Sequence, residues 1–122
     1  MNIVAKLIAV AMVATAAVVS GCKSSANIAR QDPKDVAYTL AAGKTFNEVV
    51  NVAAARRRWL PQSLENGSVR CIYEQRAHRV VVDVVPGSGS FSIVFVESNI
   101  PDAKYNQWVN NLCREIVARA AK

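Results

Sequence analysis

The sequence predicts a small two-layer α+β domain. An antiparallel sheet of three to four strands should pack against two helices, in the order strand, helix, three strands, helix. Apolar residues alternate, imperfectly, with polar ones in residues 69–96, which favours strands, and recur at helical spacing in residues 45–58 and 99–120. The connections between the three central strands are too short for a parallel crossover, so the sheet should be antiparallel. We expect residues 34–122 to form a single domain.

The first two elements should be a short strand and a helix. Residues 36–40 have a β-rich centre and end at a turn, which favours a strand. Thr45 and Glu48 are spaced as a capping box, which marks a helix start. The helix should end before Trp59, because Pro61 disfavours helical geometry in the residue ahead of it. The residues expected on its buried face are Phe46, Val49, Val50, Ala53 and Ala54.

Three strands should follow the Asn66-Gly67 turn signal. The glycine-rich residues 86–90 lack the lysine and the following helix of a phosphate-binding loop, and therefore predict a hairpin connection. The residues expected to face the helices are Val69, Cys71, Tyr73, His78, Val80, Val82, Val84, Phe91, Ile93 and Phe95. The opposite face carries Ser92 and also Val81, Val85, Val94 and Val96. We therefore expect that face to be partly covered or sticky.

The last helix has the clearest amphipathic pattern. It should begin at residues 99–102, since proline is tolerated in a first turn and Asp102 suits the positive end of the helix dipole. Its apolar stripe should cover the sheet face that carries Cys71, Val82 and Ile93. The residues of that stripe are Tyr105, Trp108, Val109, Leu112, Cys113, Ile116, Val117 and Ala120.

The first 22 residues have the form of an export signal. Lys6 precedes an uncharged run, Leu7–Val19, which is too short to span a bilayer and is followed by Ser20, Gly21 and Cys22. Val19-Ser20-Gly21-Cys22 resembles the lipobox of bacterial lipoproteins, with valine where leucine is more usual. The resemblance implies removal of residues 1–21 by cleavage between Gly21 and Cys22. Cys22 would then carry a diacylglycerol and an N-acyl chain such as palmitate.

The same resemblance implies a location. Polar residues 22–33 would be a lipidated flexible tether. Lys23, rather than aspartate, follows the cysteine, which favours the periplasmic face of the outer membrane over the inner membrane. The mature chain would hold 14 basic and 9 acidic residues, a net charge of +5. Such a surface fits an envelope protein, an anionic lipid or an acidic wall polymer as partner, or it serves solubility alone. Nucleic acid is a poor partner for an exported chain.

Cys71 and Cys113 remain once Cys22 is assigned to the lipid. In an oxidising compartment they allow one intramolecular disulfide, between a strand and the helix that covers it. The alternative is two buried free thiols that act as small hydrophobes.

No catalytic constellation is visible. His78 is the only histidine, so no site with paired histidines can bind a metal, and no cofactor motif occurs. Ser88 and Ser90 lie in a hairpin tip rather than on a nucleophile elbow. The acidic residues are scattered, so no carboxylate pair is predicted.

One cluster has the character of a binding surface: Arg56, Arg57, Arg58 and Trp59, which Arg76 and Arg79 could extend. Guanidinium groups bind phosphates and carboxylates bidentately, and indole prefers interfaces. The alternative is that the arginines complement the helix dipole while Trp59 packs in the core. Tyr105 and Trp108 are likewise either core residues or a ligand platform.

The mature chain also resembles a set of small, uncharacterised bacterial envelope lipoproteins. The resemblance rests on Trp59, Arg76, Phe91–Phe95 with Ser98-Asn99, and Tyr105–Val109. Those proteins more often have glycine where this chain has Arg58. The resemblance implies one compact domain and carries over no activity. We therefore expect a non-enzymatic binding or structural lipoprotein. The alternatives are a small periplasmic hydrolase or wall-modifying enzyme, or an inhibitor that uses the residue 86–90 tip.

Overall fold

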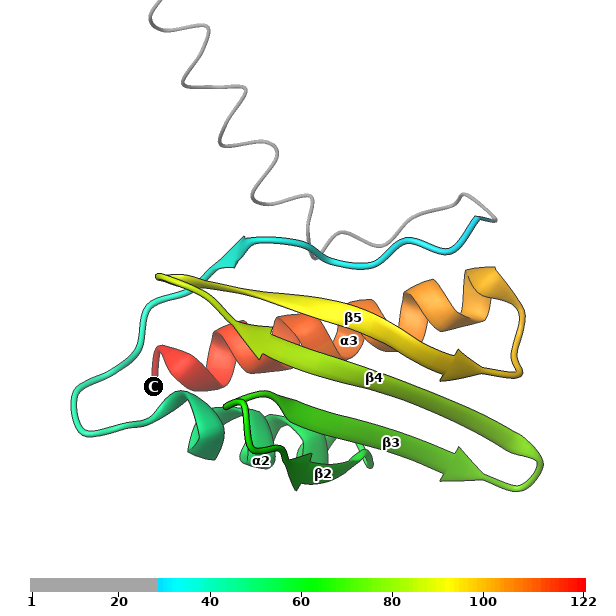
Figure 1. The fold of residues 1–122 in the computed structure, drawn as a ribbon, viewed down its shortest axis with the longest axis horizontal. Helices are drawn as coiled ribbons and strands as arrows, with labels where there is room; N and C mark the ends of the chain where they lie inside the picture. The colour runs from blue at the N-terminus through cyan, green and yellow to red at the C-terminus, as the bar shows by residue number, and fades with distance from the viewer. Residues whose placement is uncertain (1–28) are drawn as a thin grey trace, which may run out of the picture.

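The structure, a computed structural model, describes residues 29–122. Five strands form one antiparallel sheet in the order β1-β5-β4-β3-β2, and α2 and α3 cover one face of it (Figure 1). The elements are β1 (Val36–Ala37), α2 (Phe46–Arg56), β2 (Leu60–Ser63), β3 (Val69–Gln75), β4 (His78–Pro86), β5 (Ser90–Ser98) and α3 (Asp102–Ala120). The α+β class is confirmed. The signal peptide, its cleavage position at Gly21 and Cys22, and the lipidation of Cys22 lie outside the described residues.

The sheet has five strands, so the expected three to four were too few. The missed strand is β2, which pairs with the first half of β3 at the outer edge of the sheet. Its four residues include Pro61, which cannot donate to a strand ladder and therefore argues against a strand inside a sheet. An edge position tolerates the proline because the missing donor can face solvent. The expected strand at residues 36–40 is also shorter, since β1 contains only Val36 and Ala37.

Helix α2 begins and ends through local contacts. The Glu48 amide donates to Thr45 Oγ1 at 3.2 Å and the Thr45 amide donates to Glu48 Oε1 at 3.1 Å, which confirms the capping box. At the other end, the Trp59 amide donates to the Ala54 carbonyl at 2.8 Å and the Arg58 amide donates to the Ala55 carbonyl at 3.1 Å. This pair of bonds is a Schellman motif.

A tight turn connects β2 to β3, and another connects β3 to β4. Gly67 has φ +90°, and Leu64 donates to Ser68 at 2.9 Å, as the turn signal predicted. The β3–β4 loop contains only Arg76 and Ala77, and Arg76 has φ +58°. That conformation is unfavourable for a residue other than glycine.

The inward and outward faces of the strands follow the predicted alternation. Val81 and Val82 are separated by a β-bulge against β5, where Val81 pairs with Glu97 and Val82 with Phe95, so that Val96 is the extra residue. On the open face Val81 is buried, whereas Val94 and Val96 are 46% and 38% exposed. The residues that pack toward the helices are Val69, Cys71, Tyr73, Val80, Val82, Val84, Phe91, Ile93 and Phe95. His78, which was expected among them, is exposed at the start of its strand.

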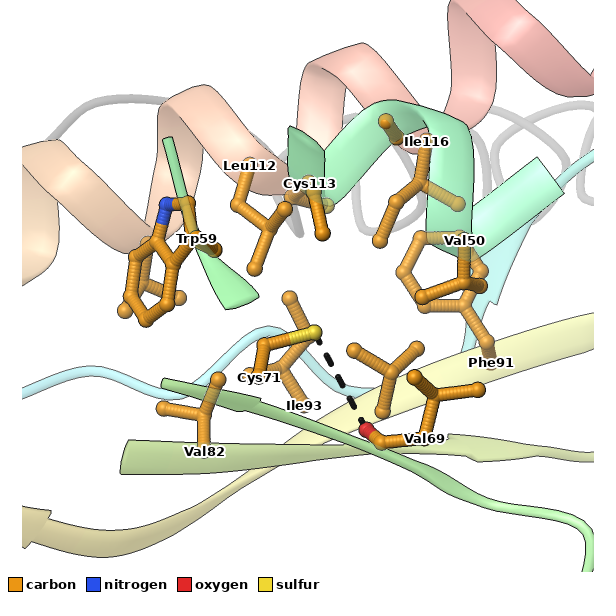
Figure 2. Close-up of a cluster of buried hydrophobic side chains, with 14 of the residues drawn as sticks. Val50, Trp59, Val69, Cys71, Val82, Phe91, Ile93, Leu112, Cys113 and Ile116 are labelled. Atoms are coloured by element: carbon orange, nitrogen blue, oxygen red, sulfur yellow. Dashed lines mark hydrogen bonds between the residues drawn. The ribbon is translucent and has the colours of Figure 1, made fainter. Parts of the chain in front are cut away.

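Helix α3 lies beside α2 over the sheet, and its apolar stripe fills the middle of the core (Figure 2). All eight predicted stripe residues are buried or partly buried. The interior also holds two polar residues that the pattern did not predict, Asn106 and Asn110. No helix within residues 29–122 is long and apolar enough to cross a bilayer.

The start of the described chain is held on the domain, where a flexible tether to residue 33 was expected. The Gln31 amide donates to Asn106 Oδ1 at 2.7 Å, and Asn106 Nδ2 donates to the Ala29 carbonyl at 2.8 Å. Tyr105 donates its hydroxyl to Asp32 at 2.7 Å. The segment then runs along the outer side of β5 (Figure 1), where the Ile93 amide donates to Pro33. Residues 29–33 therefore pack on the domain, because side chains of α3 bind them.

The cysteine pair is in neither of its two expected states, because Cys71 is a free thiol and Cys113 is not. Cys71 therefore forms no disulfide with Cys113. Figure 2 shows Cys71 projecting from the sheet and Cys113 from α3, and both residues are fully buried. The Cys71 sulfur lies 4.0 Å from the Val69 carbonyl oxygen, turned toward its own strand.

Candidate functional site

The candidate site is a small cavity of about 180 Å³ between the end of α2, strand β3 and helix α3. Its lining residues are Arg57, Trp59, Tyr73, Trp108 and Asn111, and we call it the aromatic pocket. Three elements that are far apart in the sequence therefore build it together.

Aromatic rings form the wall of this pocket. The centroids of Tyr73 and Trp108 lie 4.5 Å apart, and those of Trp59 and Tyr73 lie 5.5 Å apart in an edge-to-face arrangement. Trp59 is only 3% exposed, whereas Tyr73 and Trp108 are half-buried. The buried indole thus supports Tyr73, which with Trp108 can offer ring surface to a ligand.

The backbone at the end of α2 places Trp59 in this wall. Arg58 has φ +69°, in the left-handed region that closes the Schellman motif. This turn brings the chain back, so that Trp59 packs under the sheet while the Arg58 side chain remains exposed. Arg58 also lies beside Tyr73, in a shallower hollow with Glu74 and Gln75.

A cluster of arginines surrounds Glu115 beside the pocket. Arg56 Nε donates to Glu115 Oε2 at 3.0 Å, and Arg57 Nε lies 3.3 Å from Oε1. Arg119 Nε is 3.2 Å from Oε2, close enough for an ion pair but without hydrogen-bond alignment. Three guanidinium groups thus share one carboxylate, which leaves two positive charges in excess.

The six residues of the predicted basic patch have different positions. Arg56 and Arg57 pair with Glu115, and Trp59 joins the core. Arg76 is exposed in the β3–β4 turn. Arg79 is held between Glu74, to which it donates, and Glu97, whose Oε2 is 3.0 Å away. Of the six, only Arg57 and Trp59 line the aromatic pocket, and Arg58 lies in the neighbouring hollow.

Sequence reasoning missed Tyr73 and Asn111 as pocket residues and left Trp108 open as core or platform. Tyr73 had been placed only on the inward face of its strand. That it lies where two tryptophans meet depends on how α2 and α3 cross β3. The one signal in the sequence was the presence of both tryptophans near the ends of apolar stripes.

A second cavity, of about 400 Å³, lies beside the first half of α2 and the end of α3. Its polar side chains are occupied within the fold. Glu48 caps α2, Lys44 Nζ donates to the Arg119 carbonyl at 3.3 Å, and Asn51 donates to Asn47. We therefore place the candidate site in the smaller aromatic pocket.

Two buried groups, the Cys71 thiol and the Tyr105 hydroxyl, are neutral at ordinary pH. Burial, with a smaller effect from Asp83, raises the pKa of the Cys71 thiol to about 12, so it is a poor nucleophile. Burial and the hydrogen bond to Asp32 raise the pKa of Tyr105. His78 lies at the edge of the aromatic cluster, 6.2 Å from Trp108 between ring centroids. Within residues 29–122, no three His, Cys, Asp or Glu side chains are grouped to hold a metal ion.

Comparison with protein-family models, curated proteins and solved structures found no match to this chain.

Proposed function

We propose that this protein is a lipid-anchored, non-enzymatic binding module of the bacterial cell envelope. Acylated Cys22 would hold it at the periplasmic face of the outer membrane, and the aromatic pocket would hold a ligand without converting it. The observation that carries the binding role is the pocket itself. It combines half-buried ring surface, an amide and a guanidinium, which are groups that orient a ligand.

The anchor is supported by the resemblance of Val19-Ser20-Gly21-Cys22 to a lipobox. Two or three acyl chains give durable attachment, whereas a single chain binds reversibly.

Metabolic labelling with a clickable fatty acid tests the anchor. The wild-type protein should take up the label and sediment with membranes, and a density gradient should place it with the outer membrane. Cys22→Ala should lose the label. Cys71→Ala is a matched control, because it removes a cysteine from the domain and should leave labelling unchanged. Equal labelling of Cys22→Ala and wild type would contradict the proposal.

A further inference from the structure

The aromatic pocket has the size and chemistry for a single acidic sugar. We infer that it binds a sugar ring that carries a phosphate or a carboxylate. The inference deepens the binding role proposed above and rests on it, but it does not depend on the lipid anchor.

The size of the pocket limits the ligand to one ring. Sites for drug-sized ligands and cofactors occupy roughly 300–1,000 Å³. The aromatic pocket measures about 180 Å³, which is below that range and matches one sugar ring. A monosaccharide unit, free or at the end of a chain, is the class of polar ligand that fits this space.

The wall of the pocket matches both sides of a sugar. The C–H face of a pyranose is apolar and packs against aromatic rings, which Tyr73 and Trp108 provide. Hydroxyl groups need donors and acceptors at the rim, and the Asn111 amide supplies both. The Tyr73 hydroxyl donates to Gln75 Oε1 at 2.7 Å, so its oxygen remains able to accept from a sugar hydroxyl.

The charge around the pocket selects an acidic sugar over a neutral or cationic ligand. Glu115 contacts Arg57 through Nε, and its charge is already shared with Arg56 and Arg119. The Arg57 side chain is 45% exposed, so its guanidinium can also reach a phosphate or carboxylate, which guanidinium groups bind in pairs of hydrogen bonds. An aromatic cage for a quaternary ammonium would need the opposite charge at its rim.

Intrinsic fluorescence gives a direct test, because both tryptophans of the chain line this pocket. The full-length protein, purified with mild detergent, is titrated with glucose 6-phosphate, glucuronate, glucose and inorganic phosphate. We expect saturable fluorescence changes with the two acidic sugars, at concentrations about tenfold lower than for glucose or for inorganic phosphate. A tenfold preference corresponds to about 1.4 kcal/mol.

Variants separate the contributions of charge and ring. Arg57→Gln should weaken binding of acidic sugars at least about tenfold and change glucose binding little. Asn111→Asp removes a donor and adds a negative charge, so it should weaken binding of all the sugars and of the acidic sugars most. Arg76→Gln is the matched control, since this exposed arginine lies in the β3–β4 turn and should leave every titration unchanged. Trp108→Ala, followed by calorimetry, should lose binding of all the sugars. Urea unfolding of each variant confirms that it is folded.

The outcomes also identify the source of the sugar and separate this inference from the anchor. Tighter binding of glucose 6-phosphate would indicate sugar phosphates, as in lipopolysaccharide, and tighter binding of glucuronate would indicate carboxylated wall sugars. Cys22→Ala should titrate like wild type, so loss of the anchor leaves the inference standing. No fluorescence change with either acidic sugar, equal affinity for inorganic phosphate, or an equal loss in Arg76→Gln would overturn it.

Discussion

The backbone at Arg58 allows a quantitative test of the strain beside the candidate site. Arg58 has φ +69° at the end of α2, and its side chain is exposed. Glycine adopts this conformation freely because it has no Cβ. We predict that Arg58→Gly stabilises the protein.

The expected gain follows from two opposing terms. A left-handed conformation costs a residue with a Cβ about 1–2 kcal/mol. Glycine also gives the unfolded chain more conformational freedom, which lowers the free energy of unfolding by about 0.5–1 kcal/mol. The net gain should therefore be about 0.5–1 kcal/mol. For a domain of this size, that corresponds to a rise in Tm of about 2–6 °C.

Urea unfolding followed by circular dichroism measures the difference, and calorimetry gives the Tm. Arg58→Ala is the control, because it removes the same charge but keeps the Cβ, so its stability should be close to that of wild type. If alanine and glycine stabilise equally, the effect comes from charge repulsion among the arginines and the strain argument is wrong. If glycine destabilises the protein, the Arg58 side chain contributes to the fold.

The remaining predictions concern other positions. Arg76→Gly should also stabilise by about 0.5–1 kcal/mol in urea unfolding, because φ is +58° there; a loss of stability would contradict this. The buried Cys71 thiol should not react with maleimide in the native protein and should react fully in urea. Its pKa is raised from 9.0 to about 12, so the folded state holds this proton more tightly than the unfolded state. This contribution to stability is complete below pH 9 and is lost as the pH rises to about 12, so the decline over that range should be smaller in Cys71→Ala. Tyr105→Phe removes the 2.7 Å bond to Asp32 and should cost about 1 kcal/mol. It should also speed trypsin cleavage after Arg30, and an unchanged cleavage rate would show that other contacts hold this segment.

Local features made much of the fold predictable. The capping box of α2 involves residues three positions apart, and the stripe of α3 repeats along one helix, so both are visible in the sequence. Most of the inward-facing residues of β3, β4 and β5 followed from alternation along each strand, although His78 was wrong. These features depend on neighbours in the chain.

Other features depended on partners far away in the sequence. Strand β2 exists because β3 offers an edge, and its proline gave the opposite signal. The polar character of residues 29–33 predicts a tether. In the structure Asn106, which is 75 residues after Gln31, accepts a hydrogen bond from the Gln31 amide. The run of arginines at the end of α2 predicts one basic surface. In the structure Arg56 and Arg57 pair with Glu115 of α3, which is 59 residues after Arg56.

By itself the sequence determined the α+β class, the approximate limits of both helices and most of the inward faces of the three long strands. The tertiary structure alone decided that Cys71 is a free thiol, that residues 29–33 pack on the domain, and that Trp59, Tyr73 and Trp108 form one pocket beside an excess of positive charge. The physical reason is the sequence separation of the residues that interact. Hydrogen bonds within a turn and side-chain periodicity act over a few residues, whereas a pocket depends on how helices and strands that lie apart in the chain pack against one another.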